Sequence, residues 1–284
     1  MAKILKGAPV AAALDEKTAA AVSELKAKQI VPTLAILRVG EREDDLSYER
    51  GAMKRCAKTG VEVKNVVLPG DVTTAELLSC VAELNADETV HGVLMFRPLP
   101  KHLDEKAVCA ALSPAKDVDG ITAGSMAGVF MNSGEGYPPC TAQSCMEILK
   151  YYNVDTAGKR AAVIGRSLVI GRPVAMLLMH ANATVSVCHS RTGDIPAVTR
   201  DADIVVAAIG RSESITADHF TGGQTVLDVG INWSEKKGKL VGDVAYETVE
   251  PVVSAITPVP GGVGSVTTAV LVSHVADAAG RGVG

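Results

Sequence analysis

Apolar residues along the first hundred positions fall into two alternating patterns. Short apolar segments predict buried strands, and they lie at residues 32–39, 61–68 and 92–96. Apolar side chains at helical spacing predict helices around these strands, at residues 15–28, 44–59 and 74–85. Gly60 is placed to end the second helix, and Thr73 or Thr74 to cap the third. This alternation predicts a mostly parallel sheet covered by helices.

Residues 113–140 interrupt the pattern because they are rich in glycine and proline, which predicts a loop-rich crossover with short helical pieces. A helix at 141–152 then leads into a second series of strands, predicted at 161–164, 184–188, 204–209 and 225–229. A last helix, 267–279, follows a glycine-rich turn and is expected to pack on the first domain. We therefore predict an α/β protein of two domains. Residues 1–142 with 265–284 form an N-terminal α/β domain, and residues 143–264 form a Rossmann-type doubly wound parallel sheet.

The composition argues against several classes of function. The chain of 284 residues carries 28 Lys and Arg against 32 Asp and Glu, so its net charge of −4 argues against nucleic acid as the main partner. Aromatic residues make up only 3%, too few for a base-stacking surface. No uncharged apolar run reaches the roughly 18 residues of a membrane helix, and the first residues lack the apolar core of a secretory signal. We expect a cytoplasmic protein that does not bind membranes. The six cysteines are widely spaced, which predicts free thiols and no metal site.

The chemistry most clearly indicated is a phosphate-binding turn after the strand at 161–164. Gly165 ends that strand, Arg166 and Ser167 follow, and Gly171 precedes Pro173 at the predicted start of a helix. Glycines allow the backbone to turn sharply beside a pyrophosphate, and a helix N-terminus offers free N–H donors. The spacing differs from GxGxxG, so an ordinary strand–helix turn is the alternative.

The next strand ends in a way that favours NADP over NAD. A carboxylate at this place would bind the ribose 2′-hydroxyl of NAD, whereas here the residues are His189, Ser190 and Arg191. A 2′-phosphate would be bound by Ser190 and Arg191, with Arg166 from the first turn. The alternatives are a solvated loop charge for Arg191 and a structural histidine for His189. Two further strand ends complete the candidate cofactor site: the small residues Ala208 and Gly210 leave room for the cofactor, and the backbone at Gly230 and Ile231 could reach the nicotinamide carboxamide. Ordinary packing is the alternative for each.

Several further motifs occur in a definite order along the chain. They are Tyr48 on an early helix, Pro98-Leu99-Pro100, Lys116-Asp117-Val118-Asp119-Gly120, Pro139-Cys140-Thr141, Asp228-Val229-Gly230-Ile231-Asn232 and Pro258-Val259-Pro260-Gly261-Gly262-Val263-Gly264. Together with the turn at Gly165 and the Cys188-His189-Ser190 segment, they make the chain resemble the methylenetetrahydrofolate dehydrogenase/cyclohydrolase family. The resemblance spans nearly the whole chain, and the motifs are highly specific only in combination.

The resemblance implies a folate-binding catalytic domain, an NADP-binding domain and a central cleft. It implies oxidation of 5,10-methylenetetrahydrofolate to the methenyl form with NADP, hydrolysis to the 10-formyl form, and a cytoplasmic homodimer. Asp119 corresponds to the family's pterin-binding aspartate and Tyr48 to its active-site tyrosine; a turn aspartate and an ordinary helix tyrosine are the alternatives. Both are the catalytic candidates. The remaining substrate-binding candidates are Pro98, Leu99, Pro100, Gly262 and Val263.

The sequence departs from the family at the positions that serve the hydrolysis step. The family lysine four residues after the tyrosine is Ala52 here, and its supporting glutamine is Phe96. Lys54 lies about 120° around the helix from Tyr48 and does not replace that lysine. Asp45 stands where the family has serine, and Ser265 replaces a late proline. We therefore hypothesise that dehydrogenase activity remains while cyclohydrolase activity is weak or absent, unless Arg97 takes over the missing charge.

Three alternatives remain at this stage. The chain could be a fully bifunctional enzyme in which another group replaces the lysine. It could be a different NADP-dependent dehydrogenase that acts on a small acid, although such enzymes present a lysine base in the cleft that is not evident here. It could also be a non-catalytic NADP sensor.

Overall fold

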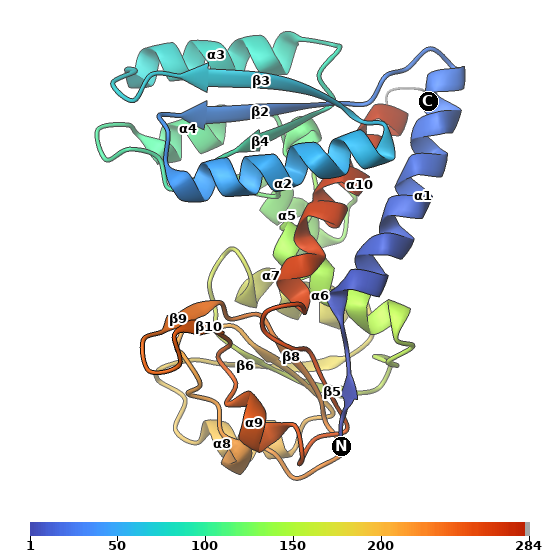
Figure 1. Cartoon of the computed structure of the whole chain (residues 1–284), viewed down its shortest axis with the longest axis vertical. Helices are drawn as coiled ribbons and strands as arrows, with labels where there is room; N and C mark the ends of the chain where they lie inside the picture. Colours follow the sequence, from blue (N-terminus) through green and yellow to red (C-terminus); the bar gives the residue numbers. More distant parts are fainter. Residues whose placement is uncertain (282–284) are drawn as a thin grey trace. The chain divides into compact units, whose positions relative to one another are not determined.

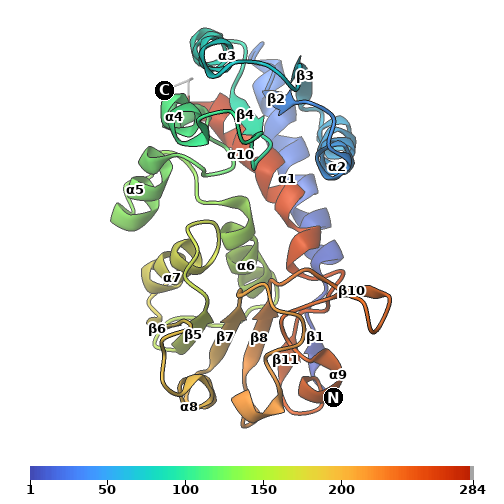
Figure 2. The same cartoon turned by 90° about the vertical axis from the view of Figure 1, so that its left-hand side faces the viewer.

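The computed structural model describes residues 1–281, which form two compact units (Figures 1 and 2). Unit 1 consists of Met1–Ala11 and Thr141–Thr267, and unit 2 consists of Ala12–Cys140 and the chain from Thr268 onward. Each unit is a parallel sheet covered by helices, as the alternating pattern predicts. The α/β fold class is therefore confirmed.

Unit 2 is built on a three-stranded parallel sheet in the order β3-β2-β4. The strands are β2 (Thr33–Val39), β3 (Glu62–Leu68) and β4 (Gly92–Met95). β2 and β4 are almost wholly buried, whereas β3 alternates between exposed and half-buried positions because it lies at an edge. Figure 1 shows α3 and α2 beside this sheet. The helices of this unit are α1 (Gly7–Ala27), α2 (Glu43–Thr59), α3 (Thr74–Ala86), α4 (Glu105–Ala111), α5 (Ala123–Met131) and α10 (Thr267–Arg281), with a short 3-10 turn η1 (Pro114–Lys116).

Local signals account for several of the helix ends in unit 2. Thr73 caps α3 and exchanges hydrogen bonds with Glu76 in a capping box, and α2 ends at Gly60 with φ of 82°. The sequence analysis missed α4, which is only seven residues long and begins at the cap Asp104. α1 begins eight residues earlier than predicted, at Gly7 rather than Asp15. Its alanine-rich first turns show little amphipathic contrast, so the periodicity does not reveal them.

Unit 1 contains a six-stranded parallel sheet in the order β1-β11-β8-β7-β5-β6. Its strands are β1 (Lys3–Ile4), β5 (Arg160–Ile164), β6 (Thr184–Cys188), β7 (Ile204–Ala207), β8 (Thr225–Asp228) and β11 (Ala255–Ile256). A small antiparallel hairpin joins β9 (Asn232–Ser234) to β10 (Lys239–Val241). The helical elements are α6 (Cys140–Tyr151), α7 (Gly171–His180), α8 (Ile195–Arg200), α9 (Tyr246–Val249), η2 (Ala217–His219) and η3 (Val263–Ser265). Figure 2 shows the sheet strands lying side by side.

The first residues of the chain differ from the expected domain division. We placed the N-terminus wholly in the first domain, but Met1–Ala11 belong to unit 1. The reason is that β1 pairs with β11, where Lys3 lies opposite Ala255 and Ile4 opposite Ile256. At the other end of the chain, residues 268–281 of α10 belong to unit 2.

All six cysteines are free thiols, and four of them are buried. Among residues 1–281, no helix is both long and apolar enough to cross a membrane. Each unit has its own apolar core, built around β5, β7 and β8 in unit 1 and around β2 and β4 in unit 2.

Candidate functional site

The glycine turn predicted to bind phosphate lies at the carboxyl end of β5. Gly165 has φ of +125°, and a Cβ at this position would lie 2.1 Å from the backbone oxygen of Ala208. The N–H of Gly165 donates to the Cys188 carbonyl at 2.9 Å, and the N–H of Ala208 donates to Ile164 at 2.8 Å. Only glycine fits between these two strand ends, since it lacks a Cβ and accepts this backbone angle.

The turn continues into the N-terminus of α7, where Pro173 occupies the first turn as predicted. The hydroxyl of Ser167 accepts the N–H groups of Ile170 at 3.2 Å and Gly171 at 3.4 Å. Arg166 and Ser167 are exposed. The backbone donors of this helix end and the Arg166 guanidinium can both interact with an anionic group.

A short loop after β6 carries the residues predicted to select NADP. The His189 ring accepts the N–H of Arg191 at 3.1 Å, and the His189 backbone N–H donates to the Thr192 hydroxyl at 3.0 Å. His189 therefore shapes the loop, which agrees with the structural interpretation of that histidine. Ser190 and Arg191 are exposed at its tip.

Two buried carboxylates organise the ends of β7 and β8, and sequence reasoning missed their role. Asp228 ends β8, and Asp243 follows β10 in a segment with no more than a turn-like Gly-Asp pattern. The pKa of Asp228 is raised to about 7, mainly because burial disfavours the charged form; the backbone N–H donors lower this pKa and the Asp243 charge raises it. Gly230 and Ile231 share a hollow of about 230 Å³ with residues 258–265. The structure thus brings two predicted cofactor residues beside the predicted substrate residues Gly262 and Val263.

In unit 2, Tyr48 lies on α2 and packs against Phe96, the residue that follows β4. The two rings meet edge to face, with centroids 5.9 Å apart and planes at 82°. Ala52, one helical turn after Tyr48, is fully buried, whereas Lys54 is exposed. Lys54 therefore reaches solvent, while the Tyr48 side of α2 lies against the apolar ring of Phe96.

Two neighbouring aspartates after η1 have different tasks. The Asp117 carboxylate is fully buried and accepts the N–H groups of Ile121 and Thr122 and the Ser125 hydroxyl, at 2.6–2.9 Å. It therefore holds the chain at the start of α5. Asp119 instead interacts with the Cys140 thiol and the Arg97 guanidinium, which both lower its pKa.

Burial is the dominant influence on Asp119, and it raises the pKa to about 6. A half-buried carboxyl group that is not held by backbone donors is suited to accept hydrogen bonds from a ligand. Among the two carboxylates, the structure thus favours Asp119 as the ligand-binding candidate.

The segment Pro98-Leu99-Pro100 is tied to its surroundings through the backbone. The Leu99 N–H donates to Glu105 at 2.7 Å, and the Pro98 carbonyl accepts from the Arg42 guanidinium at 2.8 Å. Leu99 is buried, while Pro98 is exposed. This arrangement fixes the path of the chain between Phe96 and α4.

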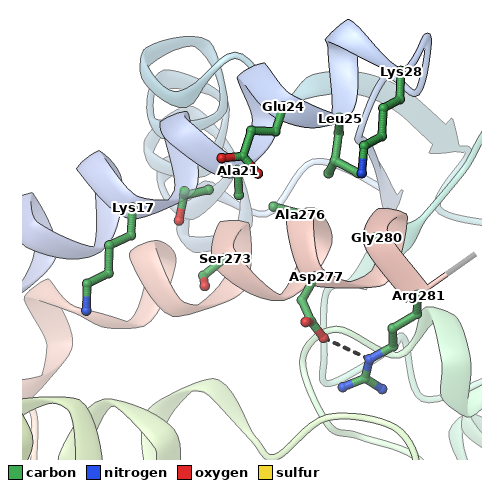
Figure 3. Close-up of a pocket in the computed structure, with 11 residues that line it drawn as sticks. Lys17, Ala21, Glu24, Leu25, Lys28, Ser273, Ala276, Asp277, Gly280 and Arg281 are labelled. Carbon is green, nitrogen blue, oxygen red and sulfur yellow. Dashed lines mark hydrogen bonds and ion pairs between the residues drawn. The ribbon is translucent and has the colours of Figure 1, made fainter. Parts of the chain in front are cut away.

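A groove of about 540 Å³ lies between α1 and α10, apart from these candidates (Figure 3). Its lining mixes positive charges such as Lys17 and Lys28 with negative ones such as Glu24. Arg281 in this groove already pairs with Asp277 at 2.8 Å. Among residues 1–281, no group of three or more His, Cys, Asp or Glu side chains is arranged to hold a metal ion.

Comparison with known protein families matches both parts of the chain to domains of one family. Residues 5–119 match the catalytic domain of tetrahydrofolate dehydrogenase/cyclohydrolase, and residues 139–282 match its NAD(P)-binding domain. The bifunctional protein FolD of Carboxydothermus hydrogenoformans is 51% identical over 275 residues, covering 96% of each chain.

Solved structures of the same family have the same fold as this chain. The bifunctional FolD enzyme of Campylobacter jejuni superposes with a TM-score of 0.95 at 37% identity, covering 99% of each chain. The Trypanosoma brucei methylenetetrahydrofolate dehydrogenase-cyclohydrolase, solved with NADP cofactor and an inhibitor, has a TM-score of 0.91 at 34% identity, covering 99% of this chain and 98% of the other.

Proposed function

The chain belongs to the tetrahydrofolate dehydrogenase/cyclohydrolase family, and from this premise we propose that it oxidises 5,10-methylenetetrahydrofolate to 5,10-methenyltetrahydrofolate with NADP. The observation that carries the proposal is the glycine turn of unit 1, with Ser190 and Arg191 exposed beyond the next strand. A 2′-phosphate on the cofactor would be held by these two side chains together with Arg166. NAD, which lacks that phosphate, is the weaker candidate.

Bound NADP would supply the hydride acceptor for the folate methylene carbon. The residues of this chain bind and orient the two molecules. In unit 2, Asp119 would accept paired hydrogen bonds from the amino-pyrimidinone edge of the pterin. Tyr48 would pack on the substrate and donate its hydroxyl proton in a hydrogen bond. Backbone groups of Pro98–Pro100 and of Gly262 and Val263 would complete the substrate contacts.

The same residues support a weak cyclohydrolase. Ala52 is fully buried and has no group that can transfer a proton, and Phe96 places an aromatic ring against Tyr48. General acid–base assistance contributes about 10²–10⁴-fold to a rate, so hydrolysis of methenyltetrahydrofolate should lose most of its acceleration. Hydride transfer depends on alignment and is less affected.

A fully bifunctional enzyme is the second candidate, and the names of the relatives fit it at least as well as they fit an enzyme with weak cyclohydrolase activity. Arg97 is the residue that would make it possible. Its guanidinium is close enough to Asp119 to lower the pKa of that carboxyl group. A positive charge near the pterin could stabilise the developing alkoxide in place of the missing lysine.

Two initial-rate assays on one preparation distinguish the candidates. NADPH formation from methylenetetrahydrofolate should be rapid, and loss of methenyltetrahydrofolate should barely exceed the rate in buffer. In Ala52→Lys with Phe96→Gln, hydrolysis should rise about 10²-fold or more. Met53→Lys is the matched control, because it adds the same charge at a more exposed neighbouring position. Rapid hydrolysis by the unaltered enzyme would establish the bifunctional candidate, and no gain in the double variant would refute the explanation based on these positions.

We further propose a cytoplasmic homodimer associating through unit 1. The edge strand β6 supports this, because Val187 on it is 41% exposed and its outer edge pairs with no other strand among residues 1–281. Sedimentation equilibrium tests the dimer, and a mass of one chain at micromolar concentration would contradict it. Cell fractionation tests the location.

A further inference from the structure

Asp243 is a fully buried carboxylate whose four hydrogen bonds reach two separate segments of unit 1. One oxygen accepts the N–H groups of Ile209 at 2.6 Å and Gly210 at 3.0 Å. The other accepts the N–H of Arg211 at 2.8 Å and the side-chain amide of Asn232 at 3.0 Å. Three successive backbone donors after β7 are thus turned inward onto a single side chain.

Asp228 holds Asp243 in place from the end of β8. Its carboxylate accepts the N–H groups of Gly230 at 3.1 Å, Asp243 at 3.0 Å and Val244 at 3.0 Å. Asp228 at the end of β8 fixes the Asp243 backbone, and the Asp243 side chain in turn fixes the loop after β7. We call these two linked aspartates the relay; it is structural and transfers no proton. The relay is reinforced by a backbone hydrogen bond from Ile215 to Asp243 at 2.9 Å.

The backbone at Gly230 is adapted to this relay. A Cβ on Gly230 would lie 2.2 Å from an Asp243 carboxylate oxygen, so a larger residue would force the carboxylate out of place. The close approach of a glycine and a carboxylate shows that the segment after β8 is shaped around Asp243. Both segments that Asp243 touches belong to the carboxyl ends of neighbouring strands, which is where a dinucleotide binds in this fold.

We propose that Asp243 is a positioning residue for the NADP-binding site. It draws the N–H groups of Ile209–Arg211 away from the cofactor and orients Asn232, so the two loops have their ligand-bound form before NADP arrives. Because the loops are already ordered by folding, NADP binding does not have to order them, and the affinity for the cofactor is higher. The proposal deepens the NADP function proposed above and rests on it.

A purely structural role makes a different prediction. Loss of a structural carboxylate lowers the fraction of folded enzyme and leaves the affinity of the folded molecules unchanged. Loss of a positioning residue raises the Kd and KM for NADP in the molecules that remain folded. Measuring the Kd for NADP beside the KM for folate therefore distinguishes a structural role from a positioning role.

The decisive variant is Asp243→Asn, examined by calorimetric titration with NADP and by steady-state kinetics. An amide oxygen can accept at most two of the four hydrogen bonds, and the amide nitrogen faces other donors. We expect the Kd and KM for NADP to rise at least about tenfold, with the folate KM within about twofold of the unaltered value. The matched control is Asp117→Asn, since Asp117 is equally buried and also accepts backbone donors but lies in unit 2. That variant should lose stability and keep its Kd for NADP.

An unchanged Kd in folded Asp243→Asn would overturn the proposal. If this variant does not fold, amide hydrogen exchange of the unaltered protein decides. The amides of residues 209–211 should be protected without NADP, and exchange as fast as in an unstructured peptide until NADP is added would overturn the proposal. Failure of the unaltered protein to bind NADP would instead refute the proposed function.

Discussion

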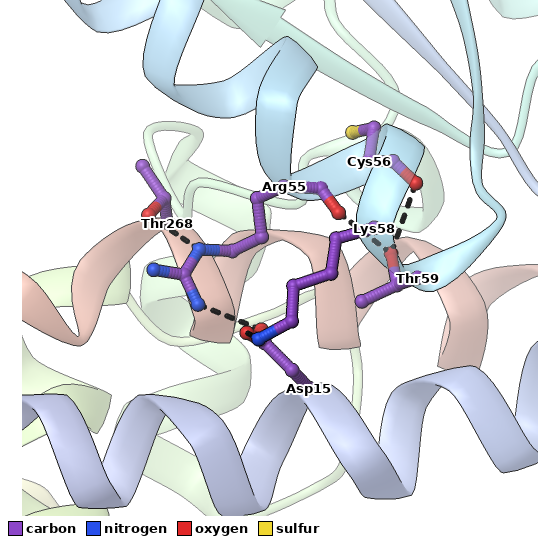
Figure 4. Close-up of polar contacts among 6 residues, drawn as sticks. All are labelled: Asp15, Arg55, Cys56, Lys58, Thr59 and Thr268. Atoms are coloured by element: carbon purple, nitrogen blue, oxygen red, sulfur yellow. Dashed lines mark hydrogen bonds and ion pairs between the residues drawn. The ribbon is translucent and has the colours of Figure 1, made fainter.

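Asp15 offers the sharpest test of how unit 2 is held together. Its carboxylate lies on α1 and accepts from Arg55 at 2.7 Å and from Lys58 at 2.9 Å, both on α2. Arg55 also donates to the Thr268 hydroxyl of α10 at 2.9 Å. Figure 4 shows how these side chains join three helices. Because the Asp15 side chain is only 6% exposed, the change Asp15→Asn removes a negative charge that water cannot replace.

The expected loss follows from the burial of each partner. Breaking a buried pair costs about 3–5 kcal/mol when one charge is left without a partner. Arg55 is 20% exposed and keeps its Thr268 bond, so the charge left behind is partly compensated. The Lys58 side chain is 63% exposed, and its pair contributes no more than about 1 kcal/mol. We therefore expect Asp15→Asn to lower the free energy of unfolding by about 2–3 kcal/mol.

Urea denaturation followed by circular dichroism measures this loss. The matched control is Glu62→Gln, which breaks the pair between Lys26 of α1 and Glu62 of β3. That pair is 3.8 Å long and 39% and 64% exposed, so its loss should cost under about 0.5 kcal/mol. Equal losses in the two variants, or a loss below about 1 kcal/mol for Asp15→Asn, would refute the reasoning from burial.

Two further predictions concern the turn at Gly165 and the buried histidine of α10. Gly165→Ala places a methyl group against the Ala208 carbonyl, so we expect the Kd for NADP, measured by titration, to rise more than about tenfold. The control Gly51→Ala, whose new methyl group meets no atom within 4 Å, should leave this Kd unchanged. A Gly165→Ala variant that binds NADP as tightly as the unaltered protein would contradict the prediction. Burial lowers the pKa of His274 to about 4, so the unfolded chain binds a proton that the folded chain does not, and stability should fall as the pH drops from 6.5 to 4, by at most about 3 kcal/mol. His274→Asn keeps a donor for the Val118 carbonyl but has no group that titrates in this range, so its stability should fall less between pH 6.5 and 4. Urea denaturation midpoints measured across this pH range test the prediction, and identical pH profiles for the variant and the unaltered protein would contradict it.

Residues with short-range physical tasks could be recognised in the sequence. Gly60 ends α2 and Thr73 caps α3 because their effects depend on the few residues beside them. The turn at Gly165 could be located for the same reason, since an apolar strand followed by glycine is a local pattern.

Other features depend on residues that are far apart in the chain. The strands β1 and β11 have two residues each, too few for any periodicity, and they form because Lys3 and Ile4 meet a sheet edge some 250 positions later. The sequence could not show that Asp117 accepts backbone donors while Asp119 interacts with the Cys140 thiol and Arg97 instead, because both aspartates occur in one short motif.

The sequence by itself determined the α/β class, the two sheets and the family to which the chain belongs, because periodicity and motif order are written in neighbouring residues. Only the tertiary structure decided that Asp243 joins the ends of β7 and β8 and that Ala52 is sealed from water. The physical reason is that burial and hydrogen-bond partners exist only after distant segments have packed together, so a carboxylate in a short turn has no recognisable role until the chain is folded.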